Sequence, residues 1–129
     1  MFAHVNDVTR AVIGAAIEVH RRLGPGLLES AYQKCLCHEL ALSGIPFEYE
    51  VKLPLEYKGI KLQHGYRVDL VVAGLVVVEG KSIESIAPIH EAQLLTYLRL
   101  GGWTVGLLIN FNVVVLKNGV RRRVLGLRE

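Results

Sequence analysis

The stretch from Tyr66 to Ser82 constrains the fold more than any other part of the chain. Two apolar runs flank Ala73-Gly74, a dipeptide typical of turns, and this pattern predicts a β-hairpin. Pairing Asp69 with Glu79 keeps the charged side chains on one face, whereas a slip of one residue mixes charge into both faces. We therefore predict the register in which these two carboxylates lie opposite each other, with roughly 5 Å between their Cβ atoms. Lys81 follows Glu79 by two residues and shares its face.

Two carboxylates beside a lysine on a sheet face have two interpretations. The first is a surface cluster of ion pairs, which is the usual fate of charges on a strand. The second is a site for a hard cation such as Mg²⁺, which prefers oxygen ligands. In that site Lys81 would act on the attacking water or on the charge of the transition state. The spacing of Asp69, Glu79 and Lys81 alone leaves both interpretations open.

The composition predicts one folded domain over residues 1–129, because 51% of the residues are hydrophobic and 21% are charged. The formal net charge of +3 is compatible with a polyanionic partner but does not require one. No apolar run reaches 18 residues, so no membrane partner is expected. Residues 1–10 lack the apolar region of a signal peptide, and we therefore expect a cytoplasmic protein.

Hydrophobic periodicity predicts three helices. Asn6 is expected to cap the first helix, which runs to about Leu23. The second helix is expected from about Leu28 to Ser43. The third helix is expected to begin at Pro88, where the missing N–H costs nothing, and to end at Gly101-Gly102.

Seven strands are expected, and they give the element order ααββββαβββ. They lie over 47–55, from residue 60 onward, on both sides of the 73–74 turn, and over 103–110, 113–117 and 120–125. Asn118-Gly119 predicts the turn of the last hairpin. The strands on either side of the third helix form a β-α-β crossover and should be parallel. The predicted fold class is therefore α/β, with a mixed sheet flanked by helices, the first helix on one face and the third on the other.

The helices carry further polar residues, each of which has a purely structural explanation as well as a functional one. Glu29 lies in the first turn of the second helix, where a carboxylate suits the helix dipole. His90, Gln93 and Tyr97 share one side of the third helix, at positions i, i+3 and i+7. A histidine on a helix surface is usually only solvated.

The motifs of the chain resemble those of the GxxExxY family of small bacterial and archaeal proteins. The signature G-x-x-E-x-x-Y is matched by Gly26 to Tyr32. Four further blocks match in family order, over residues 65–69, 79–81, 88–97 and 106–112. That family resembles the PD-(D/E)XK nuclease superfamily, and Gln93-x-x-x-Tyr97 is similar to the Q-x-x-x-Y motif of RecB-type and Cas4-type nucleases.

The resemblance implies roles that the residues alone leave open. Asp69 and Glu79 would hold Mg²⁺, with Mn²⁺ as the alternative, and Lys81 would assist the attack of water. Glu29 would be a further acidic residue and ligand at the metal. Gln93 and Tyr97 would face the site from the third helix and complete the catalytic set.

Three residues are candidate contacts for the substrate, namely Arg67, Tyr32 and His90, and Arg67 has the alternative of pairing with Asp69 or Glu79. The chain departs from the superfamily pattern at Gly80, the middle residue of E-x-K, where an apolar residue is usual. Gly80 faces the apolar side of the hairpin in the predicted register. The departure therefore concerns packing and strand rigidity, not the reacting groups.

Two functional hypotheses follow. The first is a Mg²⁺-dependent nuclease that hydrolyses phosphodiester bonds, in DNA more readily than in RNA. The second is a catalytically weak module that binds nucleic acid or a protein partner in a DNA-processing or defence complex. The small net charge favours the second, and it also suggests that a nuclease of this size needs a homodimer or a partner to hold substrate. The complete set of Asp69, Glu79 and Lys81 favours the first.

Overall fold

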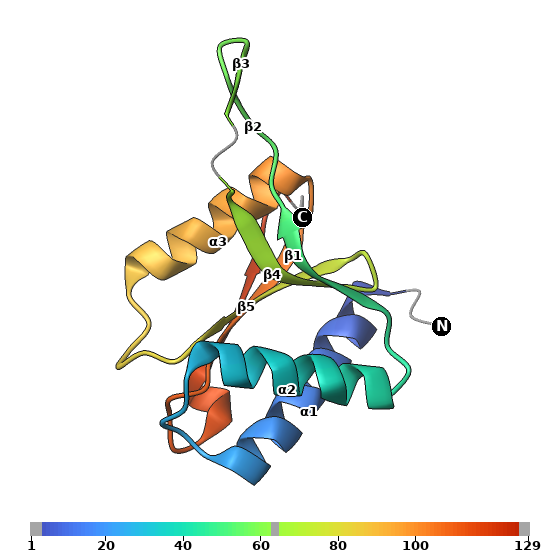
Figure 1. Cartoon of the computed structure of the whole chain (residues 1–129), viewed down its shortest axis with the longest axis vertical. Helices are drawn as coiled ribbons and strands as arrows, with labels where there is room; N and C mark the ends of the chain where they lie inside the picture. Colours follow the sequence, from blue (N-terminus) through green and yellow to red (C-terminus); the bar gives the residue numbers. More distant parts are fainter. Residues whose placement is uncertain (1–3, 63–64, 127–129) are drawn as a thin grey trace.

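A five-stranded mixed sheet forms the centre of the protein in the computed structural model, which describes residues 4–62 and 65–126 (Figure 1). The strand order is β1-β4-β5-β6-β7. The strands are β1 (Phe47–Lys52), β4 (Arg67–Val72), β5 (Val76–Lys81), β6 (Val105–Asn110) and β7 (Val120–Val124). Only the β5–β6 pair is parallel, and the other three pairs are antiparallel. The ends of the predicted 1–129 domain lie outside the described residues.

Three helices cover this sheet on its two faces. Helices α1 (Val5–Leu23) and α2 (Glu29–Leu42) lie together on one face, and α3 (Pro88–Gly101) lies on the other (Figure 1). The predicted α/β class, with a mixed sheet flanked by helices, is confirmed. None of the helices within 4–62 and 65–126 combines the length and the apolar character that a membrane crossing needs.

Each face of the sheet has its own apolar core. One cluster joins α1 and α2 to the sheet and includes Val12, Tyr32 and Leu107. The other joins α3 to the sheet and includes Leu94 and Leu98. A Cβ atom at Gly106 would lie 2.8 Å from Leu94 Cδ1, so the absence of a side chain there allows α3 to pack closely on β6.

The β4–β5 hairpin has the predicted register, with Val71 opposite Val77. Its turn places Ala73 and Gly74 in the left-handed region, with φ of 54° and 67°. The alternation of faces differs from the prediction at one residue. Val68 packs in the α3-side cluster with Val71 and Val77, not with the residues on the face of Leu70. The pleat is irregular between them, at Asp69, which has no Cα partner in either register among the described residues.

Three local predictions are wrong. Helix α1 begins at Val5, two residues earlier than a cap at Asn6 implies, and the side chain of His4 caps it by accepting from the Asn6 N–H. The strand predicted over 47–55 ends at Lys52. Residues beyond Pro54 instead form a separate hairpin, β2 (Leu55–Tyr57) and β3 (Ile60–Leu62), which projects from the domain (Figure 1).

The third wrong prediction concerns the strand over 113–117. This stretch bends and enters the 3₁₀ helix η1 (Leu116–Gly119), so the last hairpin does not form. His20 Nε2 donates to the Val113 carbonyl oxygen over 2.7 Å, and Leu116 is buried in the α1-side core. The segment over 113–117 therefore packs against α1, and β7 pairs with β6 instead.

Candidate active site

Two hydrogen bonds link Asp69 to the Glu79-Gly80 segment where the β4–β5 ladder ends. The ladder runs over residues 70–72 and 76–78. Immediately beyond it, the Asp69 N–H donates to Glu79 Oε2 over 2.7 Å, and the Gly80 N–H donates to Asp69 Oδ2 over 2.9 Å. Each carboxylate thus bonds the backbone of the opposite strand. Asp69 Oδ1 and Glu79 Oε1 lie outside these two bonds.

The surroundings of Asp69 and Glu79 disfavour a negative charge on both carboxylates at once. Glu79 is 6% exposed, and burial followed by the charge of Asp69 raises its pKa from 4.5 to about 8. Burial also raises the pKa of Asp69, although the hydrogen bond from Gly80 and the charge of Lys81 lower it. The negative charge of the two carboxylates therefore exceeds the positive charge placed near them. Such an excess is typical of a site that binds a cation or shares a proton.

Lys81 lies at the end of β5, on the strand that carries Glu79. Its charge lowers the pKa of both Asp69 and Glu79. In the parallel register Lys81 is the partner of Asn110 in β6, and the Phe111 N–H donates to its carbonyl oxygen. The sheet therefore fixes the backbone of Lys81 from the β6 side.

Glu29 is brought to the same end of the sheet by α2, of which it is the first residue. Its Oε1 atom accepts a hydrogen bond from the Ser82 N–H over 3.3 Å. Its charge contributes to the raised pKa of both Asp69 and Glu79. Glu29 therefore lies near the pair and not across the sheet from it, with one oxygen engaged by the β5–α3 loop.

Tyr97 lies on α3, which packs on the face of the sheet opposite α2. Burial raises its pKa, and the charges of Glu79 and Asp69 add to the shift, so the hydroxyl lies within their field. Gln93, one turn earlier on α3, is exposed. His90 lies a further turn back, where its Nδ1 atom accepts from the Ala87 N–H over 2.9 Å and caps the helix.

Two of the candidate substrate contacts have partners within the protein. Arg67 Nη1 lies 3.6 Å from Glu50 Oε1 at the exposed surface of the β1–β4 pair. Tyr32 is 1% exposed, and its ring stacks on Phe111 with centroids 4.5 Å apart. The Tyr32 hydroxyl donates to the Gly24 carbonyl oxygen and accepts from the Leu27 N–H, so it holds the α1–α2 loop.

Sequence reasoning missed the residues that support the site from behind. Asn110 is buried at 1% exposure, and its side chain bonds both the N–H and the carbonyl oxygen of Ile83, at 3.1 and 3.0 Å. It thereby fixes the loop that leaves Lys81. Gln33 Nε2 donates to the Asp69 carbonyl oxygen over 3.4 Å. The available signal for Asn110 was an amide side chain at the end of an apolar strand.

The donor set fits a hard divalent cation. Two carboxylates, with water and substrate phosphate completing the shell, are a usual way for proteins to bind Mg²⁺. The raised pKa of Glu79 gives the physical reason, because a bound cation would remove the repulsion between Glu79 and Asp69. Within residues 4–62 and 65–126, no three His, Cys, Asp or Glu side chains group closely enough to hold a metal ion. Glu29 is thus near the pair without forming such a group with it.

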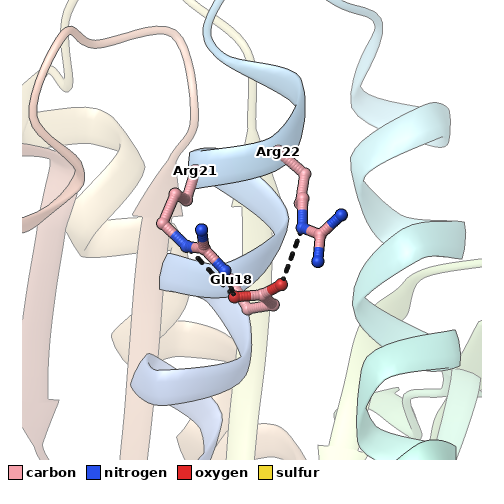
Figure 2. A network of polar contacts seen from close by, with 3 residues as sticks. All are labelled: Glu18, Arg21 and Arg22. Atoms are coloured by element: carbon pink, nitrogen blue, oxygen red, sulfur yellow. Dashed lines mark hydrogen bonds and ion pairs between the residues drawn. The ribbon is translucent and has the colours of Figure 1, made fainter.

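A second carboxylate cluster, on α1, has the opposite character (Figure 2). Glu18 Oε1 lies 2.5 Å from Arg21 Nη2, and Glu18 Oε2 lies 3.0 Å from Arg22 Nε. These hydrogen bonds, first from Arg21 and then from Arg22, lower the pKa of Glu18. The guanidinium groups neutralise the carboxylate at an exposed surface, so this cluster has no unbalanced negative charge.

Among the comparisons with known proteins, a family model matches the chain. A model described as the PD-(D/E)XK nuclease superfamily matches residues 6–123, which include all the strands of the sheet except the last residue of β7. Curated proteins give no match, and solved structures give none either.

Proposed function

Since the chain belongs to the PD-(D/E)XK nuclease superfamily, we propose that it is a metal-dependent nuclease whose reaction takes place at Asp69, Glu79 and Lys81. The observation that carries the proposal is the pairing of buried Glu79 with half-buried Asp69, both with raised pKa, on strands that also carry Lys81. Burying two repelling acids costs stability, and such sites are commonly kept for binding or catalysis.

The proposed roles follow from what each side chain offers. Asp69 and Glu79 would hold a divalent cation, Mg²⁺ or Mn²⁺, through their free oxygens. When bound, the cation supplies Lewis acidity at the phosphate and lowers the pKa of a bound water. Lys81 would orient that water and stabilise the negative charge that develops on the phosphate. Glu29 would keep the β5–α3 loop in place through Ser82 and add negative charge at the rim of the site.

The finer assignments belong to the same proposal. The motif at 26–32 supports membership of the GxxExxY family, and Gln93 and Tyr97 would contact phosphate from α3 as in nucleases of the Q-x-x-x-Y type. Arg67 and the free Nε2 of His90 are the remaining substrate contacts that we propose. We propose DNA in preference to RNA, and a cytoplasmic location. Whether a homodimer or a protein partner helps to hold the substrate is part of the test below.

The test combines metal binding with cleavage. Calorimetry with Mg²⁺ and Mn²⁺ is performed on the parent protein, on Asp69→Asn and on the matched control Glu18→Gln, which removes an exposed and compensated carboxylate. Cleavage of single- and double-stranded DNA and RNA is followed in the same buffers. We expect metal-dependent cleavage in the parent and in Glu18→Gln, and its loss in Asp69→Asn.

Two other results would count against this function. Metal binding without cleavage of any substrate, in a protein shown to be folded, would favour the catalytically weak binding module. Cleavage that persists in Asp69→Asn would place the reaction elsewhere or in a contaminant.

A further inference from the structure

A groove of about 440 Å³ runs between α2 and the edge strand β1, beside the candidate active site. The residues that matter for its chemistry are Ser30, Gln33 and Lys34 on α2, and Tyr49 and Glu50 on β1. We propose that this groove binds the base of an unpaired nucleotide adjacent to the cleaved phosphate, so that the substrate is single-stranded where it is cut. The inference rests on the proposed nuclease function and adds a substrate class to it.

The groove adjoins the segment that carries Asp69 through one of its lining residues, Gln33. Gln33, which lines it, also donates to the Asp69 carbonyl oxygen over 3.4 Å. Ser30 follows Glu29 in the chain, so the groove begins at the first turn of α2, where Glu29 meets the β5–α3 loop. A phosphate at Asp69 would therefore leave its neighbouring nucleotide at the mouth of this groove.

The chemistry of the lining suits a nucleobase. The Tyr49 side chain is 65% exposed, and an aromatic ring on an open surface is a platform on which a base stacks. Lys34 is exposed and offers an ammonium group to the backbone phosphate. A base inside a duplex already stacks on its neighbours, so only an unpaired or flipped base can use the Tyr49 ring. The volume is within the usual range for small-molecule sites, roughly 300–1,000 Å³.

The backbone of β1 is distorted in a way that builds this groove. Consecutive residues of a regular strand point to opposite faces, yet Tyr49 and Glu50 both line it. Glu50 has a φ of 52°, in the left-handed region that residues other than glycine rarely adopt. Strain of this kind persists where the surroundings hold it, and it is common at functional sites. Here Arg67 pairs with the Glu50 carboxylate at 3.6 Å.

The larger hollow of the protein does not compete for this role. It measures about 520 Å³ and lies around Gly74, at the turn end of the β4–β5 hairpin. Asp69 and Glu79 lie toward the other end of that hairpin. The groove along α2 is the one that adjoins the reacting groups.

The experiment measures binding apart from cleavage. Fluorescence anisotropy follows a labelled single-stranded dT12 oligonucleotide and a blunt 12-base-pair duplex, with Ca²⁺ in place of Mg²⁺. The variants are Tyr49→Ala, Tyr49→Phe and Tyr57→Ala, the last a matched control on the β2–β3 hairpin, where Tyr57 is 60% exposed. We expect Tyr49→Ala to weaken dT12 binding about 10-fold or more. Tyr49→Phe and Tyr57→Ala should stay within about 2-fold of the parent, and duplex binding should not change.

Three results would overturn the inference: no binding of dT12 by the parent, no effect of Tyr49→Ala, or equal weakening of dT12 and duplex. Cleavage with Mg²⁺ is measured separately, so that failure of one proposal can be told from failure of the other. If the parent cleaves DNA and Tyr49→Ala has no effect on either assay, only the groove inference fails. If dT12 binding depends on Tyr49 but no substrate is cleaved, the groove binds an unpaired base, and both the nuclease function and the placement of that base beside a cleaved phosphate fail.

Discussion

The carboxylate of Glu18 and the carboxylates of Asp69 and Glu79 lie in opposite surroundings. Glu18 is at the surface of α1, where two arginines donate to it and lower its pKa (Figure 2). Glu79 is buried and Asp69 is half-buried beside it, and burial raises the pKa of both. Their hydrogen bonds come from backbone N–H groups, which carry no formal charge.

The difference separates a carboxylate that is already paired within the protein from the carboxylates that, in the proposed function, bind a cation. A surface carboxylate between two guanidinium groups is already neutralised and has nothing further to attract. Two carboxylates whose pKa values are raised by burial and by each other have too little positive charge nearby. In the proposed function a divalent cation supplies that charge. The charge of Lys81 offsets only part of the repulsion between the carboxylates, because Glu79 still has a pKa of about 8.

The largest effect is expected when the positive charge of Lys81, next to Asp69 and Glu79, is removed. Lys81→Met should lower the rate of cleavage by about 10²- to 10³-fold, because one group that stabilises transition-state charge is lost. It should also move the ionisation of the carboxylate pair to higher pH, since the charge of Lys81 lowers both pKa values. Rate profiles against pH measure both effects, and Arg21→Met, in the surface cluster, is the control. Equal rates for the two variants would remove Lys81 from the reaction.

A divalent cation should stabilise the fold through one cluster only. At a free Mg²⁺ concentration 100 times its dissociation constant, the free energy of unfolding of the parent should rise by about 2.7 kcal/mol. Glu79→Gln, which keeps a hydrogen-bond acceptor for the Asp69 N–H, should lose most of this gain, and Glu18→Gln should keep it. Urea titrations with and without Mg²⁺ measure the difference. A full gain in Glu79→Gln would show that the cation binds elsewhere.

Without any cation, the buried pair should make stability fall as pH rises. Between pH 4.5 and about 8, the folded protein keeps a proton on Glu79 that the unfolded chain has released. The contribution is therefore fully present below pH 4.5 and is lost as the pH rises through about 8. Glu79→Gln should flatten this dependence and be more stable than the parent at pH 8 by up to about 4 kcal/mol. Urea unfolding at pH 5 and pH 8 is the measurement, and a parent protein that gains stability over this interval would contradict it.

The smallest effect is expected for the surface cluster, and it has the opposite sign in pH. Because the arginines lower the pKa of Glu18, its contribution is present above the pKa of the unfolded chain and disappears as pH falls through the lowered value. Glu18→Gln should change stability little at neutral pH and should respond to salt. Thermal unfolding at low and high ionic strength checks this. A loss as large as the gain in Glu79→Gln would erase the contrast between the clusters.

The parts of the fold that were predicted correctly depend on short-range patterns. The β4–β5 hairpin joins residues close in sequence, so the alternation of charge and apolar side chains specified its register, with Val71 opposite Val77. The β5–α3–β6 crossover followed from handedness and connection rules that apply to any such segment. By contrast, Asn118-Gly119 is a strong local turn signal that tertiary contacts overrode. Leu116 is buried, and α1 holds the Val113 carbonyl through His20.

The same division applies to the candidate site. Asp69 and Glu79 were placed together from local pattern alone, and the structure brings them within hydrogen-bond reach of each other's strands. The approach of Glu29 and Tyr97 depends on how α2 and α3 pack, which no spacing reveals, and it was expected only through a family resemblance. Asn110 and Gln33 act through backbone atoms of distant segments, and a sequence carries no separate signal for that.

The hydrogen bonds that link Asp69 to Glu79 and Gly80 have a consequence for the order in which the protein folds. The two residues are ten apart in the chain and meet by closing a single hairpin, whereas Glu29 and Ser82 are separated by 53 residues. Contacts of short sequence separation form at a small cost in loop entropy, so the mutually repelling acids come together early in folding. Protonation at acidic pH, or a cation at neutral pH, would then ease a step on the folding pathway itself. Stopped-flow refolding that is faster at pH 5 than at pH 8, with the difference lost in Glu79→Gln, is the kinetic result that this order requires.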